Sequence, residues 1–154
     1  MASPIPRLTD FLPYLMAITS NAVSSRIADE YRLRFGLRIP EWRVMAVLGD
    51  GGSMTQREMV QATVMDKVAI NRACKVLEER GLIARSPNQR DGRSHHLELT
   101  PEGRSLYAEC MPMTFEMFER IFARIEPKEQ DALKALLARI RDGVLDIDRK
   151  GGGA

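Results

Sequence analysis

The sequence predicts a mainly α-helical fold with one small β-hairpin (α+β), and residues 66–100 carry the observations behind that prediction. Apolar residues recur at helical spacing and give the segment one apolar face, and Gly81 then ends the helix as a left-handed glycine would. Two strand-like segments follow and enclose a polar loop with arginines. A helix followed directly by a basic hairpin is the outline of a winged helix-turn-helix. The apolar residues are Ile70, Ala73, Cys74 and Leu77, the strands are 82–84 and 95–100, and the loop is 87–93.

The segment before this helix completes a helix-turn-helix. Thr55 and Glu58 have the spacing of a capping box, in which each side chain accepts a hydrogen bond from a backbone N–H at the helix start. A short helix to about residue 62, a turn at 63–65 and a cap at Asp66 follow. Residues 53–54 are expected to add a short strand to the hairpin. Without the hairpin, the same pattern would fit any pair of connected helices.

The outward face of the predicted recognition helix is polar and positively charged. Residues 66–93 hold seven Lys or Arg and four Asp or Glu, a net charge of +3. The whole chain carries +2, so the other residues sum to −1 and the positive charge is concentrated where phosphates would bind. Charge alone leaves a merely solvated helix and loop as an equal alternative. The outward residues are Lys67, Ala69, Asn71, Arg72 and Lys75.

Long amphipathic helices flank a head formed by residues 40–99. Their apolar stripes exceed what one small head can cover, so we expect a single domain (1–154) that forms a twofold homodimer through residues 8–36 and 100–148. Such a dimer would place two recognition helices on a palindromic operator. The predicted helices are 8–35 (bent near Pro13, ended by Gly36), 40–48 (followed by a break at 49–52), 100–125 (bent at Pro112) and 127–147.

Composition and motifs argue against several other classes. Hydrophobic residues make up 44% and charged residues 29%, which is typical of a soluble globular protein, and no apolar run reaches the roughly 18 residues of a membrane span. The first ten residues lack a secretory pattern, so we expect a cytoplasmic protein without a membrane partner. No phosphate loop, HExxH or nucleophile elbow occurs, so we expect neither enzyme activity nor a cofactor. His95 and His96 alternate across a strand and predict no metal site.

Several segments together resemble the MarR family of winged-helix transcriptional regulators. Residues 91–93 and 99–103 (Leu-Thr-Pro-Glu-Gly) resemble the family's wing signature, and residues 77–83 resemble the end of its recognition helix. Residues 41–44 and 55–58 resemble its second and third helices. The resemblance spans nearly the whole chain in the family's order. It implies a homodimer that usually represses neighbouring genes and releases double-stranded DNA when a small molecule, often an aromatic acid, binds.

The resemblance also implies how individual residues would meet DNA. Arg93 at the wing tip would enter a narrow A·T-rich minor groove, held in place by Asp91. An alternative for Asp91-Gly92 is a simple turn dipeptide. Asn71 would read adenine and Arg72 guanine. The predicted phosphate contacts are Lys67, Lys75, Arg90 and, at a helix N-terminus, Thr55 and Gln56.

The resemblance further implies an effector site where the first long helix, the second helix and the helix after the wing meet the head. Polar residues beside an apolar stripe suit a ligand with an aromatic body and a polar end, although small residues there also suit close helix packing. Residues 21–44 further resemble members that respond to hydroxycinnamoyl-CoA thioesters, in which case Arg26, Arg34 or Arg38 would meet CoA phosphates. The candidate ligand residues are Asn21, Ser24, Ser25, Arg26, Arg38, Trp42 and Arg43.

Two other functions stay open at this stage. Cys74 could make the chain a redox-responsive regulator, which would require an exposed thiolate of low pKa. The family's peroxide sensors carry their cysteine early in the first helix, where this chain has none. The other alternative is a winged-helix module that binds protein, which would not need arginines at the wing tip.

Overall fold

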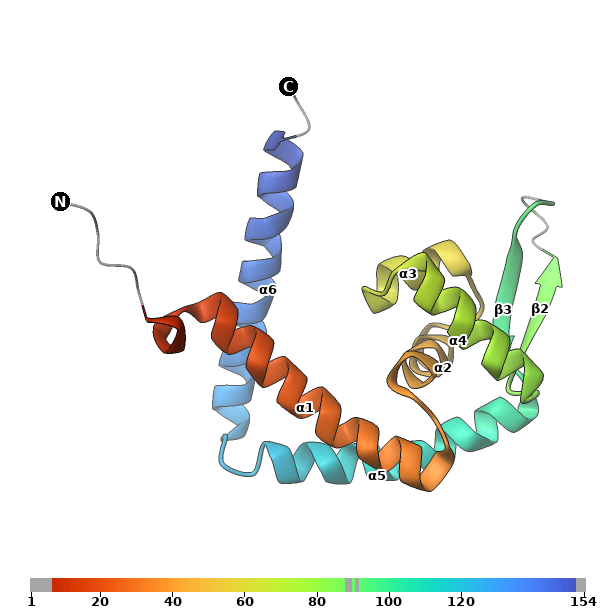
Figure 1. Ribbon diagram of the computed structural model, residues 1–154, viewed down its shortest axis with the longest axis horizontal. Helices are drawn as coiled ribbons and strands as arrows, with labels where there is room; N and C mark the ends of the chain where they lie inside the picture. Colours follow the sequence, from red (N-terminus) through yellow and green to blue (C-terminus); the bar gives the residue numbers. More distant parts are fainter. Residues whose placement is uncertain (1–6, 88–89, 91, 152–154) are drawn as a thin grey trace. The chain divides into compact units, whose positions relative to one another are not determined.

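The computed structural model describes residues 7–87, 90 and 92–151, and the chain divides into two compact units, 1–115 and 116–154. The described residues form six α-helices, one short 3-10 helix and a three-stranded antiparallel sheet (Figure 1). This architecture confirms the predicted fold class, a mainly helical winged helix.

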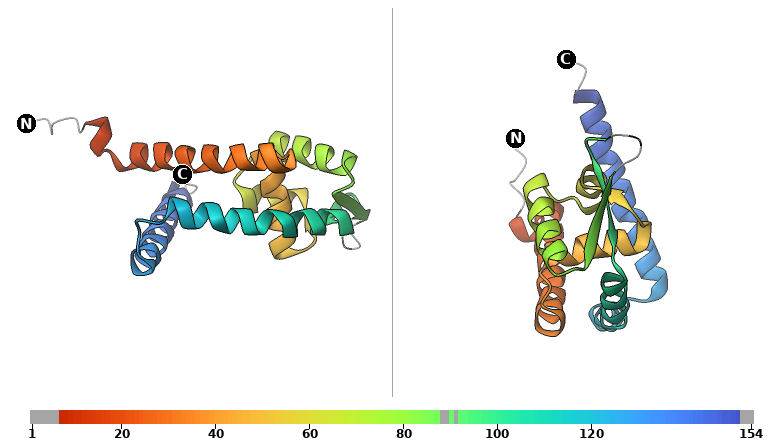
Figure 2. Two further views of the ribbon diagram at one scale, coloured as in Figure 1. Left: turned by 90° about the horizontal axis from the view of Figure 1, so that it is seen from below. Right: turned by 90° about the vertical axis from the view of Figure 1, so that its right-hand side faces the viewer.

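Three helices and the sheet form the centre of the first unit. α2 (Ile39–Gly51), α3 (Gln56–Thr63) and α4 (Lys67–Glu79) pack against one another. The strands β1 (Met54–Thr55), β2 (Ile83–Pro87) and β3 (His95–Leu99) lie in the order β1-β3-β2. Since β3 is central and contacts both α2 and α3, its residues Leu97 and Leu99 are buried. The right-hand view of Figure 2 shows β2 and β3 side by side as a hairpin.

The core of this unit is an apolar cluster drawn from every element around the sheet. The predicted inward residues of α4 are all buried, which confirms the helical period read from the sequence. Truncating such a residue to alanine typically costs about 2–5 kcal/mol of stability. The side chains with no exposed surface are Leu37, Val44, Met45, Met59, Ile70, Cys74, Leu77, Leu97 and Cys110.

The long N-terminal helix begins later than predicted. η1 (Leu8–Asp10) is a separate 3-10 turn, and the extended backbone of Phe11 separates it from α1 (Leu12–Phe35). Pro13 therefore does not bend a helix. It occupies the second position of α1, where its missing N–H leaves no bond unmade. Gly36 ends α1 in the left-handed conformation (φ 61°), as predicted.

Arg80 joins the end of α1 to the end of α4. Its guanidinium donates hydrogen bonds to the backbone oxygens of Phe35 and Gly36, each at 3.1 Å. Carbonyls at the end of a helix have no partner within it, and the helix dipole favours a cation there. The arginine in the segment that resembles the family's recognition-helix end thus connects two helices that are distant in sequence.

The Leu-Thr-Pro-Glu-Gly segment forms the start of α5 (Pro101–Ile121), and its threonine and glycine each have a structural role there. Thr100 caps the helix by accepting a hydrogen bond from Gly103 N at 3.0 Å, and its hydroxyl donates to Gly81 O at 2.6 Å. A Cβ on Gly103 would lie 1.9 Å from Leu82 O, so only glycine permits this approach. The segment is therefore a joint between α5 and the beginning of the wing.

Several other boundaries differ from the sequence prediction. α2 continues through Gly51, and the predicted break begins only at Gly52 (φ 76°). Gly49 lies within this helix, and the Tyr107 ring packs so close to it that a Cβ there would come within 2.6 Å of the ring. β1 lies one residue later than expected. β2 extends past Ala84 because it pairs with β3 as far as Pro87, opposite His95.

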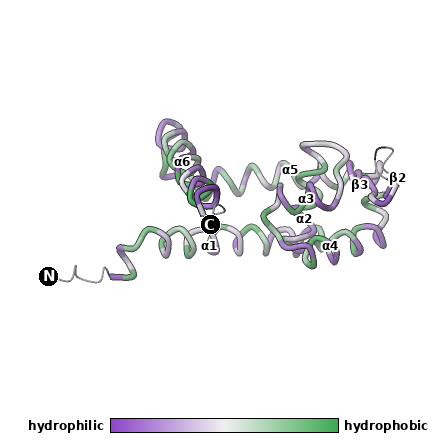
Figure 3. Tube along the Cα trace, turned by 90° about the horizontal axis from the view of Figure 1, so that it is seen from above, coloured by the Kyte–Doolittle hydropathy of each residue, from purple (hydrophilic) through white to green (hydrophobic). Residues whose placement is uncertain are grey.

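The second unit consists of the end of α5 and α6 (Pro127–Gly151). Glu129 accepts a hydrogen bond from Glu126 N at 2.9 Å and so caps α6. No residue of α6 is buried within the described chain, and its apolar residues, which include Leu136 and Ile147, are exposed by 51% and 71%. Figure 3 shows that α6 contains both hydrophobic and hydrophilic positions. Among the described helices, none has an apolar stretch long enough to cross a bilayer.

Val64, in the turn between α3 and α4, has a strained backbone. It adopts the left-handed conformation (φ 56°, ψ 32°) although its side chain is 90% exposed and packs on nothing. A β-branched residue is disfavoured there by about 1–2 kcal/mol.

We predict that Val64→Gly raises the free energy of unfolding by about 1 kcal/mol, because glycine adopts this conformation without strain. The matched control is Val68→Gly, which places the same change inside α4 and should lower stability by up to about 1 kcal/mol. Urea unfolding at one fixed protein concentration measures both values. If Val64→Gly instead lowers the free energy of unfolding, the backbone at Val64 is not strained.

Candidate nucleic-acid interface

The start of α3 is held by the predicted capping box. Thr55 N donates to Glu58 Oε2 at 2.7 Å, and Glu58 N donates to Thr55 Oγ1 at 3.2 Å. The Thr55 hydroxyl also lies 3.1 Å from Glu58 Oε2. These bonds, led by the one from the Thr55 backbone, hold the pKa of Glu58 below its usual value. Glu58 therefore stays ionised at neutral pH, and any anion approaching Thr55 would meet this charge.

The predicted recognition helix, α4, is fixed at both ends. Asp66 Oδ1 accepts a hydrogen bond from Ala69 N at 2.7 Å, as predicted for its cap. At the other end Gly81 (φ 69°) donates to Glu78 O and Leu82 N donates to Leu77 O, both at 2.9 Å. This pair of bonds is a Schellman motif. A helix with defined ends and one buried face presents its other face in a single orientation.

The outward face of α4 matches the sequence prediction and contains one residue that the prediction omitted. Lys67, Asn71, Arg72 and Lys75 are all exposed, whereas Ala69 is half-buried. Val68 lies among them and is 59% exposed. Reading the sequence for polar groups passed over this valine, although its spacing from Asn71 and Arg72 places it on the same face.

The wing is a two-stranded hairpin whose base is tied to α4. Arg85 on β2 forms an ion pair with Glu78 on α4. Arg90 and Arg93, in the loop between the strands, are exposed. The predicted partner of Arg93, Asp91, lies outside the described residues. Both loop arginines are therefore at the surface at the end of the hairpin.

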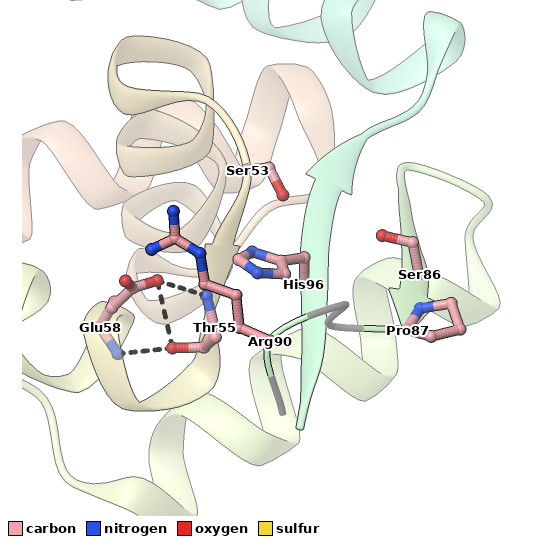
Figure 4. Close-up of a pocket in the computed structure, with 7 residues that line it drawn as sticks. All are labelled: Ser53, Thr55, Glu58, Ser86, Pro87, Arg90 and His96. Atoms are coloured by element: carbon pink, nitrogen blue, oxygen red, sulfur yellow. Dashed lines mark hydrogen bonds between the residues drawn. The ribbon is translucent and has the colours of Figure 1, made fainter. Parts of the chain in front are cut away.

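A polar cavity of about 500 Å³ separates the wing from the start of α3 (Figure 4). Thr55 at the cap of α3, Glu58 on α3, Ser86 and Pro87 on β2 and His96 on β3 line it, together with Ser53 and Arg90. Gln56, the other predicted phosphate contact on α3, is half-buried beside Thr55. Of the predicted phosphate contacts, Thr55 and Gln56 thus lie at the α3 start and Arg90 in the wing, whereas Lys67 and Lys75 lie on α4.

A stack of three aromatic rings lies where the effector site was predicted. The Trp42 ring centroid lies 4.4 Å from that of Tyr31 and 5.8 Å from that of Tyr107, in stacked geometry. Tyr31 Oη is 2.5 Å from Thr114 Oγ1, and burial raises the pKa of Tyr31 to about 12. Sequence reasoning named only Trp42, because the pairing brings together α1, α2 and α5, which are far apart in the chain.

Only some predicted ligand residues meet at this stack. Ser24, Trp42 and Arg43 line a cavity of about 170 Å³ together with Tyr31, Ile27 and Ile39. Asn21, Ser25 and Arg26 are exposed on α1 outside this cavity. Arg26 and Arg34 both pair with Glu30, at 2.7 and 3.0 Å. Arg38 precedes α2 and lines a separate cavity with Arg72 and Lys75.

The cysteines do not support redox sensing. Cys74 and Cys110 are buried free thiols, and burial raises the pKa of each to about 11. A sensor cysteine requires an accessible thiolate at neutral pH. Within the described residues, no cluster of three His, Cys, Asp or Glu could hold a metal ion.

A helix-turn-helix with a polar outward face, joined to a hairpin with arginines in its loop, has the architecture of a winged helix. When the chain is compared with known protein families, part of it matches one of them. Residues 35–94 match the MarR family. Over this segment the chain is similar to MarR-type winged-helix transcriptional regulators.

The similar proteins are regulators in several bacteria. The chain is 26% identical to the transcriptional regulator HosA of Escherichia coli over 101 residues, which is 66% of this chain and 75% of HosA. It is 26% identical over 105 residues to the transcriptional repressor Rv2887 of Mycobacterium tuberculosis (68% and 76%). Its fold matches Bordetella bronchiseptica BpsR, whose DNA binding is regulated by 6-hydroxynicotinic acid, with a TM-score of 0.80 and 24% identity over 90% of this chain and 98% of that one.

Proposed function

We propose that this protein is a homodimeric repressor that binds a palindromic operator and releases it when an aromatic small molecule binds. The observation that carries the proposal is the outward face of α4 beside the arginine-bearing wing. Regulators of this family bind DNA, dimerise and bind small-molecule effectors. The positive charge of residues 66–93 gives the head the field that attracts a phosphate backbone.

Each exposed side chain on this surface has a role suited to its chemistry. Asn71 and Arg72 would read base edges from the major groove, as an amide suits adenine and a guanidinium suits guanine. Arg93 would enter the minor groove, and Lys67, Lys75 and Arg90 would contact phosphates. Gln56 would support a phosphate at the start of α3. Thr55 would contribute there only beside the ionised Glu58, which weakens its contact with an anion.

The exposed apolar stripe of α6 supports dimerisation. Its residues include Leu133, Leu136, Ile140, Val144 and Leu145, each at least 41% exposed in the chain alone. A helix with such a stripe is stable in water when a partner covers it. A second copy of the chain would supply the covering surface, and twofold symmetry would then match a palindromic operator.

We predict that Arg93→Ala weakens operator binding at least about 100-fold, because each of two protomers loses a charged contact of about 1.5 kcal/mol. The operator is obtained by selecting duplexes from a random pool, and a gel shift gives the affinity. Arg32→Ala, which removes a cation from α1, is the control and should bind normally. Retained affinity in a folded, dimeric Arg93→Ala would refute the role.

The aromatic stack supports an aromatic carboxylate as the effector. Tyr31 and Trp42, which stack on each other, give the cavity an aromatic lining, and Ser24 and Arg43 beside them offer a hydroxyl and a cation. The cavity of about 170 Å³ is below the usual size of a ligand site, so a ring would enter by displacing a side chain such as the exposed Arg43. BpsR, a neighbour in fold, responds to an acid of this chemical class.

An aromatic acyl-CoA thioester is the larger alternative effector. It would need cations for its phosphates, and Glu30 already pairs with Arg26 and Arg34. Arg38 is left as the predicted phosphate contact. The carboxylate is therefore the better match to the charges around the stack.

We predict that an aromatic carboxylate such as a hydroxybenzoate or hydroxynicotinate releases the operator. Arg43→Gln should raise the concentration needed for release about tenfold or more without changing affinity for DNA, because a charged hydrogen bond is lost. Arg43→Lys keeps the charge and is the control. Competition in a fluorescence-anisotropy assay measures both, with the matching CoA thioesters as a second arm. Release of the operator by thioesters alone would show that the effector is an aromatic acyl-CoA rather than a free carboxylate. Release by neither class would exclude aromatic effectors.

A further inference from the structure

Val68 is an apolar residue in the middle of a polar surface. It occupies the second position of α4, and its side chain is 59% exposed. The residues three, four and seven positions further on, which share its face, are Asn71, Arg72 and Lys75, and all three are exposed. The apolar residues that hold α4 in the core are on the opposite side of the helix.

In the absence of DNA, Val68 contributes little to the stability of the fold. A β-branched residue lowers helix propensity relative to alanine or a long polar residue, and most of the Val68 side chain stays in water. Single exposed apolar residues are common on protein surfaces. Val68 differs from them in its position. It lies in the N-terminal turn of α4, and the N-terminal turn of a recognition helix is the part that reaches base edges.

We propose that Val68 reads the C5-methyl group of a thymine in the major groove, an inference that rests on the DNA-binding function proposed above. The thymine methyl is the apolar group that a base pair presents there, whereas the other groups are hydrogen-bond donors and acceptors. An aliphatic side chain on the reading face is the chemical complement of that methyl. Contact would remove both apolar surfaces from water.

The helix geometry places this thymine relative to the bases read by the polar residues. Val68 precedes Asn71 by three residues, a rise of about 4.5 Å along the helix axis. Successive base pairs are about 3.4 Å apart. The thymine is therefore expected one or two base pairs from the adenine that Asn71 would read, in both halves of the operator.

Replacing thymine by deoxyuridine removes only the methyl group and leaves base pairing unchanged. The probe is the duplex that the protein selects from a random pool, remade with deoxyuridine at one thymine position at a time in both half-sites. We expect one position to weaken binding about fourfold per half-site, or about 15-fold for the dimer, as burial of one methyl implies. The other positions should change affinity less than twofold.

A double-mutant cycle ties this effect to Val68. Val68→Ala should bind the thymine duplex about 15-fold more weakly, yet bind the thymine and deoxyuridine duplexes equally. Val76→Ala is the matched control, since Val76 is a 37% exposed valine two turns further along α4, and this variant should respond to deoxyuridine like the wild type.

Three results would overturn the assignment. One is no sensitive thymine in the half-site, and another is a Val68→Ala variant that still loses affinity on deoxyuridine. The third is a wild-type protein that selects no duplex at all, which would refute DNA binding itself and this inference with it. Specific binding without methyl sensitivity would remove the role of Val68 alone and leave the regulator function standing.

Discussion

The burial of one face of α4 is the constraint on which the rest of the structure depends. Ile70, Ala73, Cys74 and Leu77 lie in the core formed with α2, α3 and the sheet. With that face fixed, and with Asp66 and Gly81 defining the two ends, the helix has no freedom to rotate. The polar side chains and Val68 are consequently held outward without any interaction of their own. The orientation of the proposed reading surface is thus a consequence of the packing on the opposite side.

Short-range features were predictable from the sequence because a few neighbouring residues determine them. The capping box of Thr55 and Glu58, the cap at Asp66 and the left-handed Gly81 all obey local rules and are confirmed. Gly49 shows where local rules fail. Glycines predict a helix end, yet the Tyr107 ring from α5 packs on this one and the helix continues. The extension of β2 to Pro87 likewise depends on pairing with β3, which no local pattern encodes.

The functional surfaces were predictable to different degrees for the same reason. The α4 face follows from one helical period, so its exposed polar residues were identified correctly as neighbours. The aromatic stack requires α1, α2 and α5 to meet, so Trp42 was found but Tyr31 and Tyr107 were not. Arg80, which bonds to the end of α1, links the helix that carries Ser24 and Tyr31 to the end of the recognition helix. The helix that carries part of the stack is therefore hydrogen-bonded to the C-cap residue of α4.

The account rests on the claim that α4 and the wing face one duplex in a dimer. The most direct measurement is the affinity for the selected duplex as a function of salt concentration. Five cations per protomer lie on this surface: Lys67, Arg72, Lys75, Arg90 and Arg93. Lys67, Lys75 and Arg90 are the cations proposed to contact phosphates, so a dimer would make six such contacts, which alone give a log–log slope of about −5. A steep slope with two chains per duplex is the predicted result. An affinity that is independent of salt, or one chain per duplex, would contradict the account.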